Sequence, residues 1–326
     1  MLVFSACIEM MFRSLPFEER FEAVKNAGLG CAEFWGWSSR SLGDLRDASR
    51  KSGVRITSMC VGSKDPGLAA EYGKRALLSE DSGEVLFKVV EESIEAAKFL
   101  GVPALIITTG QERTDISHAE QHDCVVNALK QAAPLFERSG ITAVLEPLNI
   151  LCDHKGYFLS SGYEAFDIIR EVGSPKVKLL YDIYHQQITE GNLIPNIRSN
   201  IGLIGHFHVA DNPGRHEPGT GEINYKNVFK AIDELGYEGA VGLEYSPTGD
   251  DAQASEAVEA KVDGPDIEVA FNPGYLLDGL GVLGTTFTRL SFTAPLKPAM
   301  ITGQDSQDGE LDTTYRYVLQ PVRLAG

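Results

Sequence analysis

The 326-residue sequence is short of basic residues and has no long apolar run. Lys and Arg total 29 against 46 Asp and Glu, which leaves a net charge of −17. This acidity argues against broad contact with nucleic-acid phosphates. No window approaches the roughly 18–20 apolar residues of a membrane span, so we expect no membrane partner. The opening MLVFSACIEMMF lacks the basic region and cleavage site of a signal peptide, and we interpret it as a first strand.

Cysteine pairs are missing too. The five cysteines are odd in number and scattered, and no two have CxxC spacing: Cys7, Cys31, Cys60, Cys124 and Cys152. We therefore expect free thiols and a location in the reducing cytoplasm. Histidine is confined to the middle of the chain, because all seven lie between His118 and His216. Chemistry that needs imidazole should sit in that part.

Residues 1–250 alternate short β-branched runs with amphipathic helices. Eight strands are expected, at Leu2–Ile8, Cys31–Trp37, Val54–Val61, Ala104–Thr109, Ile141–Glu146, Lys176–Asp182, Leu203–Ala210 and Ala240–Glu244. Helices are expected between Ser14 and Gly28 and at Leu42–Lys51, Glu84–Leu100, Ala119–Ser139, Tyr163–Val172, Leu193–Ser199 and Tyr225–Leu235. Eight such βα units predict an α/β fold of the (β/α)₈ TIM-barrel type. A doubly wound open sheet competes, but polar residues end nearly every strand and no GxGxxG follows the first.

From about Ala252 the composition changes, and the helix that should close the barrel after its eighth strand is missing. His, Cys and Trp disappear, and strand-like segments take over. We expect strands at Ile267–Phe271, Thr288–Ala294, Ala299–Thr302 and Thr314–Val322, a short helix at Gly274–Leu280 and an acidic loop at Asp305–Asp312. The tail thus predicts a small α+β unit of ββαβββ type. We place the domains at 1–250 and 251–326.

Four polar residues stand at the ends of successive expected strands: Glu146, Asp182, His208 and Glu244. The carboxyl ends of barrel strands meet at one mouth. Three carboxylates and an imidazole gathered there would repel or shift pKa unless a cation neutralised them. Oxygen-rich ligands with one nitrogen favour Mg²⁺ or Mn²⁺ over Co²⁺ or Zn²⁺. Alternatively, each residue only caps its strand or pairs with an arginine.

Two further residues lie beside these strand ends. His185 follows Asp182 by three residues, and Arg215 lies in the Gly/Pro-rich loop after His208. An arginine and an imidazole suit a small oxyanionic or hydroxylated substrate. The less favoured alternative for Arg215 is a surface charge in that loop. His206 shares a strand face with His208 and is interpreted as an interior, hydrogen-bonded histidine. Gly219–Gly221 is interpreted as a turn into a helix capped by Asn224.

The stretches GHFHVADNPGRHEPGTGEINY, YDIYHQQITEGNL, LEPLN and VGLEYSP together resemble hydroxypyruvate isomerases. These belong to the xylose-isomerase-like barrel superfamily, which also holds the ketose 3-epimerases. The resemblance covers about residues 1–248. It implies a metal-dependent isomerase that interconverts hydroxypyruvate and 2-hydroxy-3-oxopropanoate (tartronate semialdehyde) through an enediolate. By motif, Glu146, Asp182, His208 and Glu244 match metal ligands, Glu146 and Glu244 the acid/base pair, and His185 and Arg215 the substrate contacts.

The same motifs leave two other substrates open. Some hydroxypyruvate isomerases carry Gln where this chain has His208, whereas the epimerases carry His. A ketose 3-epimerase and a 2-oxo-tetronate isomerase therefore remain alternatives on the same site. In each case the partner is a small hydroxy-keto acid or sugar. A homo-oligomer is left open.

The tail resembles the end of a bacterial DNA polymerase III sliding clamp, in AQASEAVEAKVDG, DIEVAFNPGYLLDGL, RLSFTAPLKPAMITG and YRYVLQPVRLAG. The resemblance covers only about the second half of that protein's third domain. Gln320–Leu324 matches a segment lining part of the family's peptide cleft, whose other wall belongs to a domain that this chain lacks. We therefore expect neither clamp-binding peptides nor encircled DNA, and interpret the chain as a chimera, either a gene fusion or an assembly artefact. A replication-associated module is the non-enzyme alternative.

Overall fold

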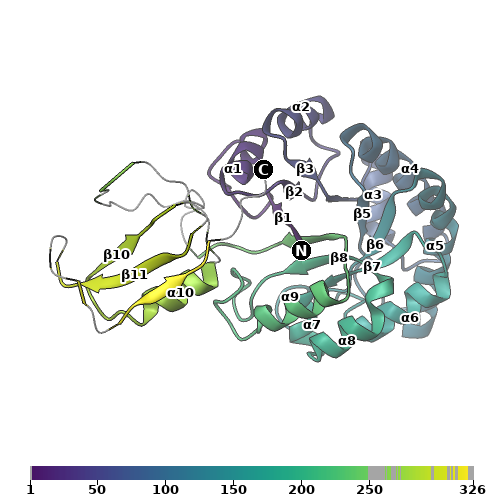
Figure 1. The fold of residues 1–326 in the computed structure, drawn as a ribbon. Helices are drawn as coiled ribbons and strands as arrows, with labels where there is room; N and C mark the ends of the chain where they lie inside the picture. The colour runs from purple at the N-terminus through teal and green to yellow at the C-terminus, as the bar shows by residue number, and fades with distance from the viewer. Residues whose placement is uncertain are drawn as a thin grey trace. The chain divides into compact units, whose positions relative to one another are not determined.

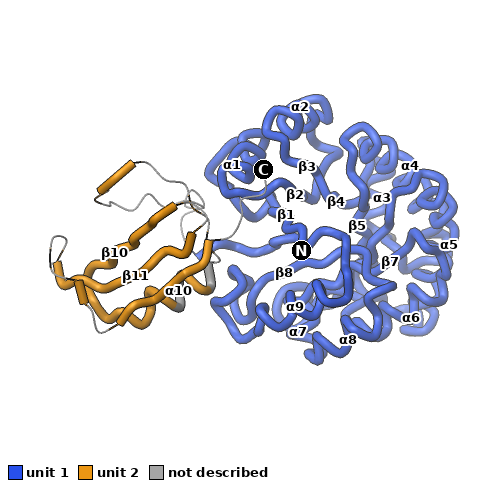
Figure 2. The backbone as a smooth tube through the Cα atoms, in the orientation of Figure 1, with its two compact units in different colours: residues 1–256 blue, residues 257–326 orange. Residues whose placement is uncertain are grey.

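The computed structural model describes residues 2–248 without a gap and, of the remainder, residues 261, 263–265, 269, 271, 273–294, 297–306, 309, 311–312 and 315–321. The chain divides into two compact units, residues 1–256 and 257–326 (Figure 2). The predicted boundary at residue 250 stays a prediction, because it lies outside the described residues.

The first unit is a parallel β-barrel with helices outside it (Figure 1). Its sheet runs in the order β3-β2-β1-β9-β8-β7-β6-β5-β4. The strands are β1 (Val3–Cys7), β2 (Cys31–Glu33), β3 (Arg55–Ile56), β4 (Ser58–Cys60), β5 (Ala104–Ile107), β6 (Thr142–Leu145), β7 (Val177–Asp182), β8 (Ile204–Val209) and β9 (Ala240–Leu243). Pairing of β1 with β9 joins the first and last barrel strands, as a barrel requires and a doubly wound sheet does not. The barrel prediction is confirmed.

One expected strand, at 54–61, is divided in two. Its first half, β3, pairs with β2, and its second half, β4, pairs with β5. Thr57 separates the halves and still donates its backbone N–H to the carbonyl of Ala32 over 2.9 Å. The nine short strands therefore occupy eight positions around the ring, and the divided strand links both ends of the sheet order.

The helices of this unit mostly lie where the apolar periodicity places them. They are η1 (Phe17–Glu19), α1 (Arg20–Asn26), α2 (Leu42–Ser52), α3 (Pro66–Arg75), α4 (Ser82–Leu100), α5 (His118–Ser139), α6 (Gly162–Val172), α7 (Ile183–Thr189), α8 (Leu193–Asn200), η2 (Ile201–Leu203) and α9 (Tyr225–Glu234). Side-chain caps begin several of them, including a capping box of Ser117 and Glu120 at α5. Asn224 caps α9, as predicted. Helices α3 and α7 were not predicted. No helix of the described residues is long and apolar enough to cross a bilayer.

Apolar packing holds the barrel in two places. A large cluster lies between strands and helices and includes Leu145, Leu179, Phe207 and Val241, all fully buried. A separate small cluster consists of Ile106, Val144 and Leu180. Because neighbouring residues of a strand face opposite sides, Val144 and Leu180 share a face with the polar residues two positions further on. The barrel interior therefore changes from apolar to polar toward the strand ends.

The second unit is small. Its antiparallel sheet has the order β10 (Phe287–Ser291), β11 (Ala299–Gln304), β12 (Tyr317–Leu319), and α10 (Pro273–Gly281) accompanies it. Leu283, Ile301 and Leu319 form its core. These elements confirm three of the expected strands and the helix, although β12 is shorter than predicted. The strand expected at 267–271 falls mostly outside the described residues, as does the stretch after Thr248, where the barrel's closing helix is expected to be missing.

Candidate functional site

Four predicted site residues meet at the carboxyl ends of β6 to β9. Glu146 follows β6 directly, Asp182 ends β7, His208 is the penultimate residue of β8, and Glu244 follows β9. Asp182 is the register partner of His208. All four are buried, and each offers a ligand atom within 4.8 Å of the other three. The structure therefore brings together residues that span almost 100 positions of sequence.

The imidazole of His208 lies between carboxylates. Its Nδ1 is 3.3 Å from both Glu146 Oε1 and Glu244 Oε2. Burial lowers the pKa of His208, but the charges of Glu244 and Glu33 outweigh it and hold that pKa well above its ordinary value. Burial likewise raises the pKa of Glu244, yet His208 and Arg215 bring it far below its ordinary value. Burial and the charge of Glu244 raise the pKa of Asp182 to about 6, against the opposing effect of Arg215.

The arrangement fits a divalent cation. Asp182 Oδ1 accepts from the backbone N–H groups of Tyr184 and His185, over 2.8 and 3.3 Å. Its other oxygen, Oδ2, and Nδ1 of His208 have no hydrogen-bond partner among the described residues, although both are buried. Buried polar atoms without partners are costly, and a cation would satisfy both. Three carboxylates with one imidazole form a donor set that suits Mg²⁺ or Mn²⁺.

The loop after β8 carries Arg215 into this cluster. Asp211, fully buried, accepts backbone N–H groups of Asn212, Gly219 and Ile223 and so fixes the loop. Arg215 lies in the left-handed region at φ +56. Its Nη2 is 2.5 Å from Glu244 Oε2 and 3.9 Å from Asp182 Oδ2. The guanidinium is therefore part of the site and is not a surface charge.

His185 lies in the first turn of α7, fully buried, with Nε2 3.5 Å from Asp182 Oδ2. Its Nδ1 accepts hydrogen bonds from the side-chain amide of Asn149 over 2.7 Å and from the Asn149 backbone N–H over 3.3 Å. Asn149 Oδ1 accepts from the backbone of Cys152 and Asp153, which fixes the amide orientation. Burial and Arg215 lower the pKa of His185 to about 4. The ring is thus neutral, with its proton on Nε2 facing the cluster.

Sequence reasoning missed three residues here. Glu33, at the end of β2, contacts His206 and His208. Trp35 donates its indole N–H to Glu244 Oε1 over 2.8 Å, and Asn149 orients His185. Glu33 could have been found, since it is the one acidic residue in the expected strand at 31–37. Burial raises the pKa of Glu33, but His208 and His206 lower it to about 2.

The interpretation of His206 as an interior histidine is confirmed. It is 2% exposed, and its Nε2 lies 2.9 Å from Glu33 Oε2. Together with Glu33 and His208 it also forms a second group whose atoms lie close enough to share an ion.

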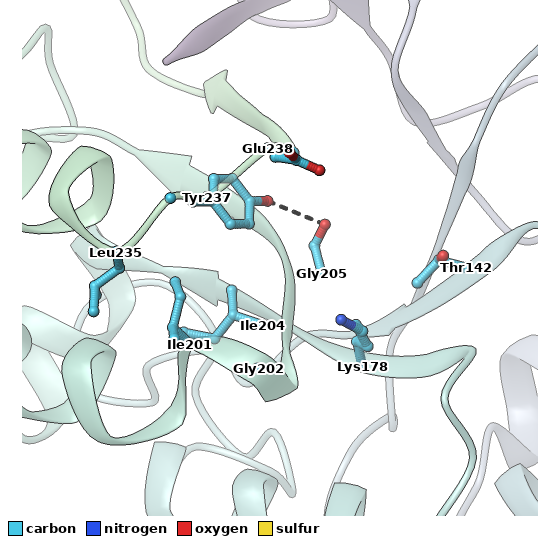
Figure 3. Close-up of a pocket in the computed structure, with 11 residues that line it drawn as sticks. Thr142, Lys178, Ile201, Gly202, Ile204, Gly205, Leu235, Tyr237 and Glu238 are labelled. Carbon is cyan, nitrogen blue, oxygen red and sulfur yellow. Dashed lines mark hydrogen bonds between the residues drawn. The ribbon is translucent and has the colours of Figure 1, made fainter. Parts of the chain in front are cut away.

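A pocket of about 380 Å³ opens at the other end of the barrel (Figure 3). Thr142 and Gly205, at the starts of β6 and β8, line it together with Lys178 and Tyr237. The hydroxyl of Tyr237 donates to the carbonyl of Gly205 over 3.1 Å. None of the predicted site residues lines this pocket, and conserved chemistry in TIM barrels belongs to the opposite face.

Comparison with known proteins agrees with this architecture. Residues 21–261 match the xylose isomerase-like TIM barrel family, and residues 238–316 match the DNA polymerase III beta subunit, C-terminal domain. The hydroxypyruvate isomerase of Escherichia coli is 34% identical over 252 residues, which cover 76% of this chain and 94% of that protein. The 2-oxo-tetronate isomerase of Cupriavidus necator is 31% identical over 245 residues, which cover 75% and 92%.

Solved structures show the same barrel. A crystal structure described as AP endonuclease, family 2, from Brucella melitensis is 28% identical, with a TM-score of 0.72 over 78% of this chain and 96% of that one. An L-ribulose 3-epimerase is 21% identical with a TM-score of 0.62, over 75% and 82%, and supports the fold alone. The chain therefore belongs to the xylose isomerase-like TIM barrel family, in which its curated relatives are isomerases, and its residues 238–316 match the C-terminal domain of the DNA polymerase III beta subunit.

Proposed function

We propose that the barrel is an isomerase that interconverts hydroxypyruvate and 2-hydroxy-3-oxopropanoate. The observation that carries the proposal is the pair of buried carboxylates, Glu146 and Glu244, that approach the same imidazole nitrogen from 3.3 Å each. Two carboxylates around one small volume can exchange a proton between adjacent carbons of a small substrate. The hydroxypyruvate isomerase and the 2-oxo-tetronate isomerase to which this chain is 34% and 31% identical support a small hydroxy-keto acid as that substrate.

Glu146 and Glu244 are the acid and base of the proposed reaction. One carboxylate removes a proton from the hydroxymethyl carbon of hydroxypyruvate, which gives an enediolate. The other, which starts as the carboxylic acid, delivers its proton to the former carbonyl carbon, while the hydroxyl proton passes between the two substrate oxygens. Proton exchange with solvent then resets the two carboxyl groups. The product is the aldehyde isomer, and no oxidant or reductant is consumed. Each well-placed acid or base contributes about 10²–10⁴ in rate.

Glu146, Asp182, His208 and Glu244 would hold the divalent cation, with Mg²⁺ or Mn²⁺ as the best match to their donor atoms. When bound, the cation supplies positive charge that offsets the charge developing on the substrate oxygens. Arg215 binds the substrate carboxylate, since its planar guanidinium can pair with both oxygens. His185 donates its Nε2–H to a substrate oxygen, because Asn149 occupies its other nitrogen.

A 2-oxo-tetronate or a ketose is the second candidate substrate. Two observations favour it. The chain has His208 at the strand end where the ketose 3-epimerases, by the resemblance, carry histidine, and one of its relatives is a 2-oxo-tetronate isomerase. The same two carboxylates would move a proton in either substrate.

The test is a turnover assay of the full chain with Mn²⁺ on hydroxypyruvate and on a panel of four- to six-carbon ketoses and oxo-acids. Highest kcat/KM on hydroxypyruvate supports the first candidate. Highest kcat/KM on a longer substrate supports the second. Turnover of no member of the panel by metal-loaded, folded protein overturns both.

A further inference from the structure

Glu33 is a buried carboxylate that the proposed chemistry does not use. It ends β2, it is 2% exposed, and it lies between two histidines of β8. Its Oε2 is 2.9 Å from Nε2 of His206, and its Oε1 is 3.0 Å from Nε2 of His208. It therefore touches a candidate metal ligand from the side opposite the other carboxylates, which approach Nδ1 of the same ring.

The surroundings of Glu33 fix its carboxylate in place. Ser58 donates its hydroxyl to Oε2 over 3.1 Å, and His206 contacts the same oxygen. On the next strand but one, Gly242 leaves the space that the carboxylate needs. A Cβ at Gly242 would lie 2.2 Å from Glu33 Oε1 and 2.6 Å from Cδ2 of His208. A side chain on β9 would therefore displace the contact between Glu33 and His208.

We propose that Glu33 is a positioning residue, which holds the proton of His208 on Nε2 so that Nδ1 presents its lone pair to a divalent cation at the strand ends. The inference rests on the proposed cation site. An imidazole ligand that gives its second N–H to a carboxylate is fixed in both tautomer and orientation. The Nε2–Oε1 pair is at hydrogen-bonding distance, although its angle falls short of a hydrogen bond. Oε1 has no other partner among the described residues, so a small rotation of the ring completes the bond.

The experiment measures Mn²⁺ binding to the full chain by titration calorimetry. Glu33→Gln removes the charge and keeps the shape. We expect its Mn²⁺ Kd to rise about 10- to 100-fold, the cost typical of losing such a support. Glu137→Gln is the matched control, because it makes the same exchange in a carboxylate of α5 that accepts the hydroxyl of Ser174 and contacts none of the candidate ligands. Its Kd should stay close to that of the parent.

Folding is checked by the metal-free unfolding midpoint of each variant. If Glu33→Gln does not fold, Glu33→Asp replaces it, since the shorter side chain keeps the charge but withdraws it from His208. We expect the same rise in Kd. A parent-like Kd in the folded variant overturns the inference and leaves the proposed reaction standing. Two Mn²⁺ per chain, falling to one in the variant, also overturns it, because Glu33 would then be a ligand. Absence of Mn²⁺ binding by the parent overturns the inference and the cation site together.

Discussion

The side-chain amide of Asn149 donates to Nδ1 of His185 over 2.7 Å, so the histidine proton must sit on Nε2, the nitrogen that faces Asp182. Asn149→Asp replaces this donor with an acceptor and would move the proton to Nδ1. We expect kcat/KM on hydroxypyruvate to fall about tenfold or more, the cost of one unmade buried hydrogen bond. Steady-state kinetics measure it. Leu151→Ala, in the same loop and 72% exposed, is the control. Equal kinetics in parent and Asn149→Asp would rule out the assigned tautomer.

Removal of either proposed acid or base should abolish most turnover. Glu146→Gln and Glu244→Gln keep side-chain shape but can neither accept nor deliver a proton, so kcat should fall about 10²- to 10⁴-fold. Far-UV circular dichroism should remain that of the parent. Glu95→Gln, on the exposed side of α4 with a carboxylate paired to Lys98, is the control. The acid/base assignment is wrong if either site variant retains near-parental kcat.

Metal removal should be reversible. After EDTA treatment and dialysis, we expect turnover of hydroxypyruvate to be lost, because the buried carboxylates of Glu146, Asp182 and Glu244 then lack a neutralising charge. Added Mn²⁺ or Mg²⁺ should restore it. Elemental analysis of the dialysed protein provides the control. Full activity in protein shown to be metal-free would contradict the proposed cation site.

Stability should depend on pH through two histidines of α5. The ring of His122 lies 2.9 Å from Glu164 on α6 and that of His118 lies 3.0 Å from it. Burial lowers both histidine pKa values, but the hydrogen bonds that the rings donate to the Glu164 carboxylate raise them above the ordinary value. A histidine whose pKa is raised in the folded state stabilises that state fully below the unfolded pKa of about 6.5. This stabilisation is lost as the pH rises through the folded-state pKa. We therefore expect His122→Gln to destabilise more at about pH 5.5 than at about pH 8.5, by roughly 0.5 kcal/mol for a half-exposed cluster.

Urea unfolding followed by tryptophan fluorescence measures this difference. Both tryptophans, Trp35 and Trp37, belong to the barrel, so the signal reports that unit alone. Lys230→Gln, whose partner Glu234 lies one helical turn away, is a control without a histidine. A destabilisation by His122→Gln that is constant across the pH range would contradict the prediction.

The tail should be dispensable for turnover. Every candidate ligand, acid/base and substrate contact lies in the first unit, and we propose that residues 1–250 fold as a domain. A chain ending at residue 250 should retain the kcat/KM of the full chain. The comparison is made at equal folded concentration, judged by tryptophan fluorescence. A truncated barrel that folds but loses turnover would assign the tail a part in the reaction.

Most of the candidate site could be predicted from the residues at the ends of the expected strands. Asp182 and His208 stand at their expected positions because side chains alternate along a strand, so a polar residue after an apolar run marks the mouth. Glu33 was missed although it is the one acidic residue of its expected strand, because its contact with His206, 173 residues away, depends on closure of the ring, which brings β2 beside the site. Helix α7 was not predicted, because it begins directly after strand β7 with no loop between them. The division at Thr57 has no signal in the sequence, because VRITSMCV at 54–61 contains no glycine, proline or other break that would separate two strands.

The two carboxylate oxygens of Asp182 have different contacts. One oxygen caps α7, and the other has no hydrogen-bond partner among the described residues and belongs to the proposed cation site, so under the proposed function a single side chain both begins a helix and binds the ion. Asparagine there would keep the cap and give up the charge, whereas alanine would forfeit both. A substitution that changes how this position binds a cation therefore also changes the start of α7.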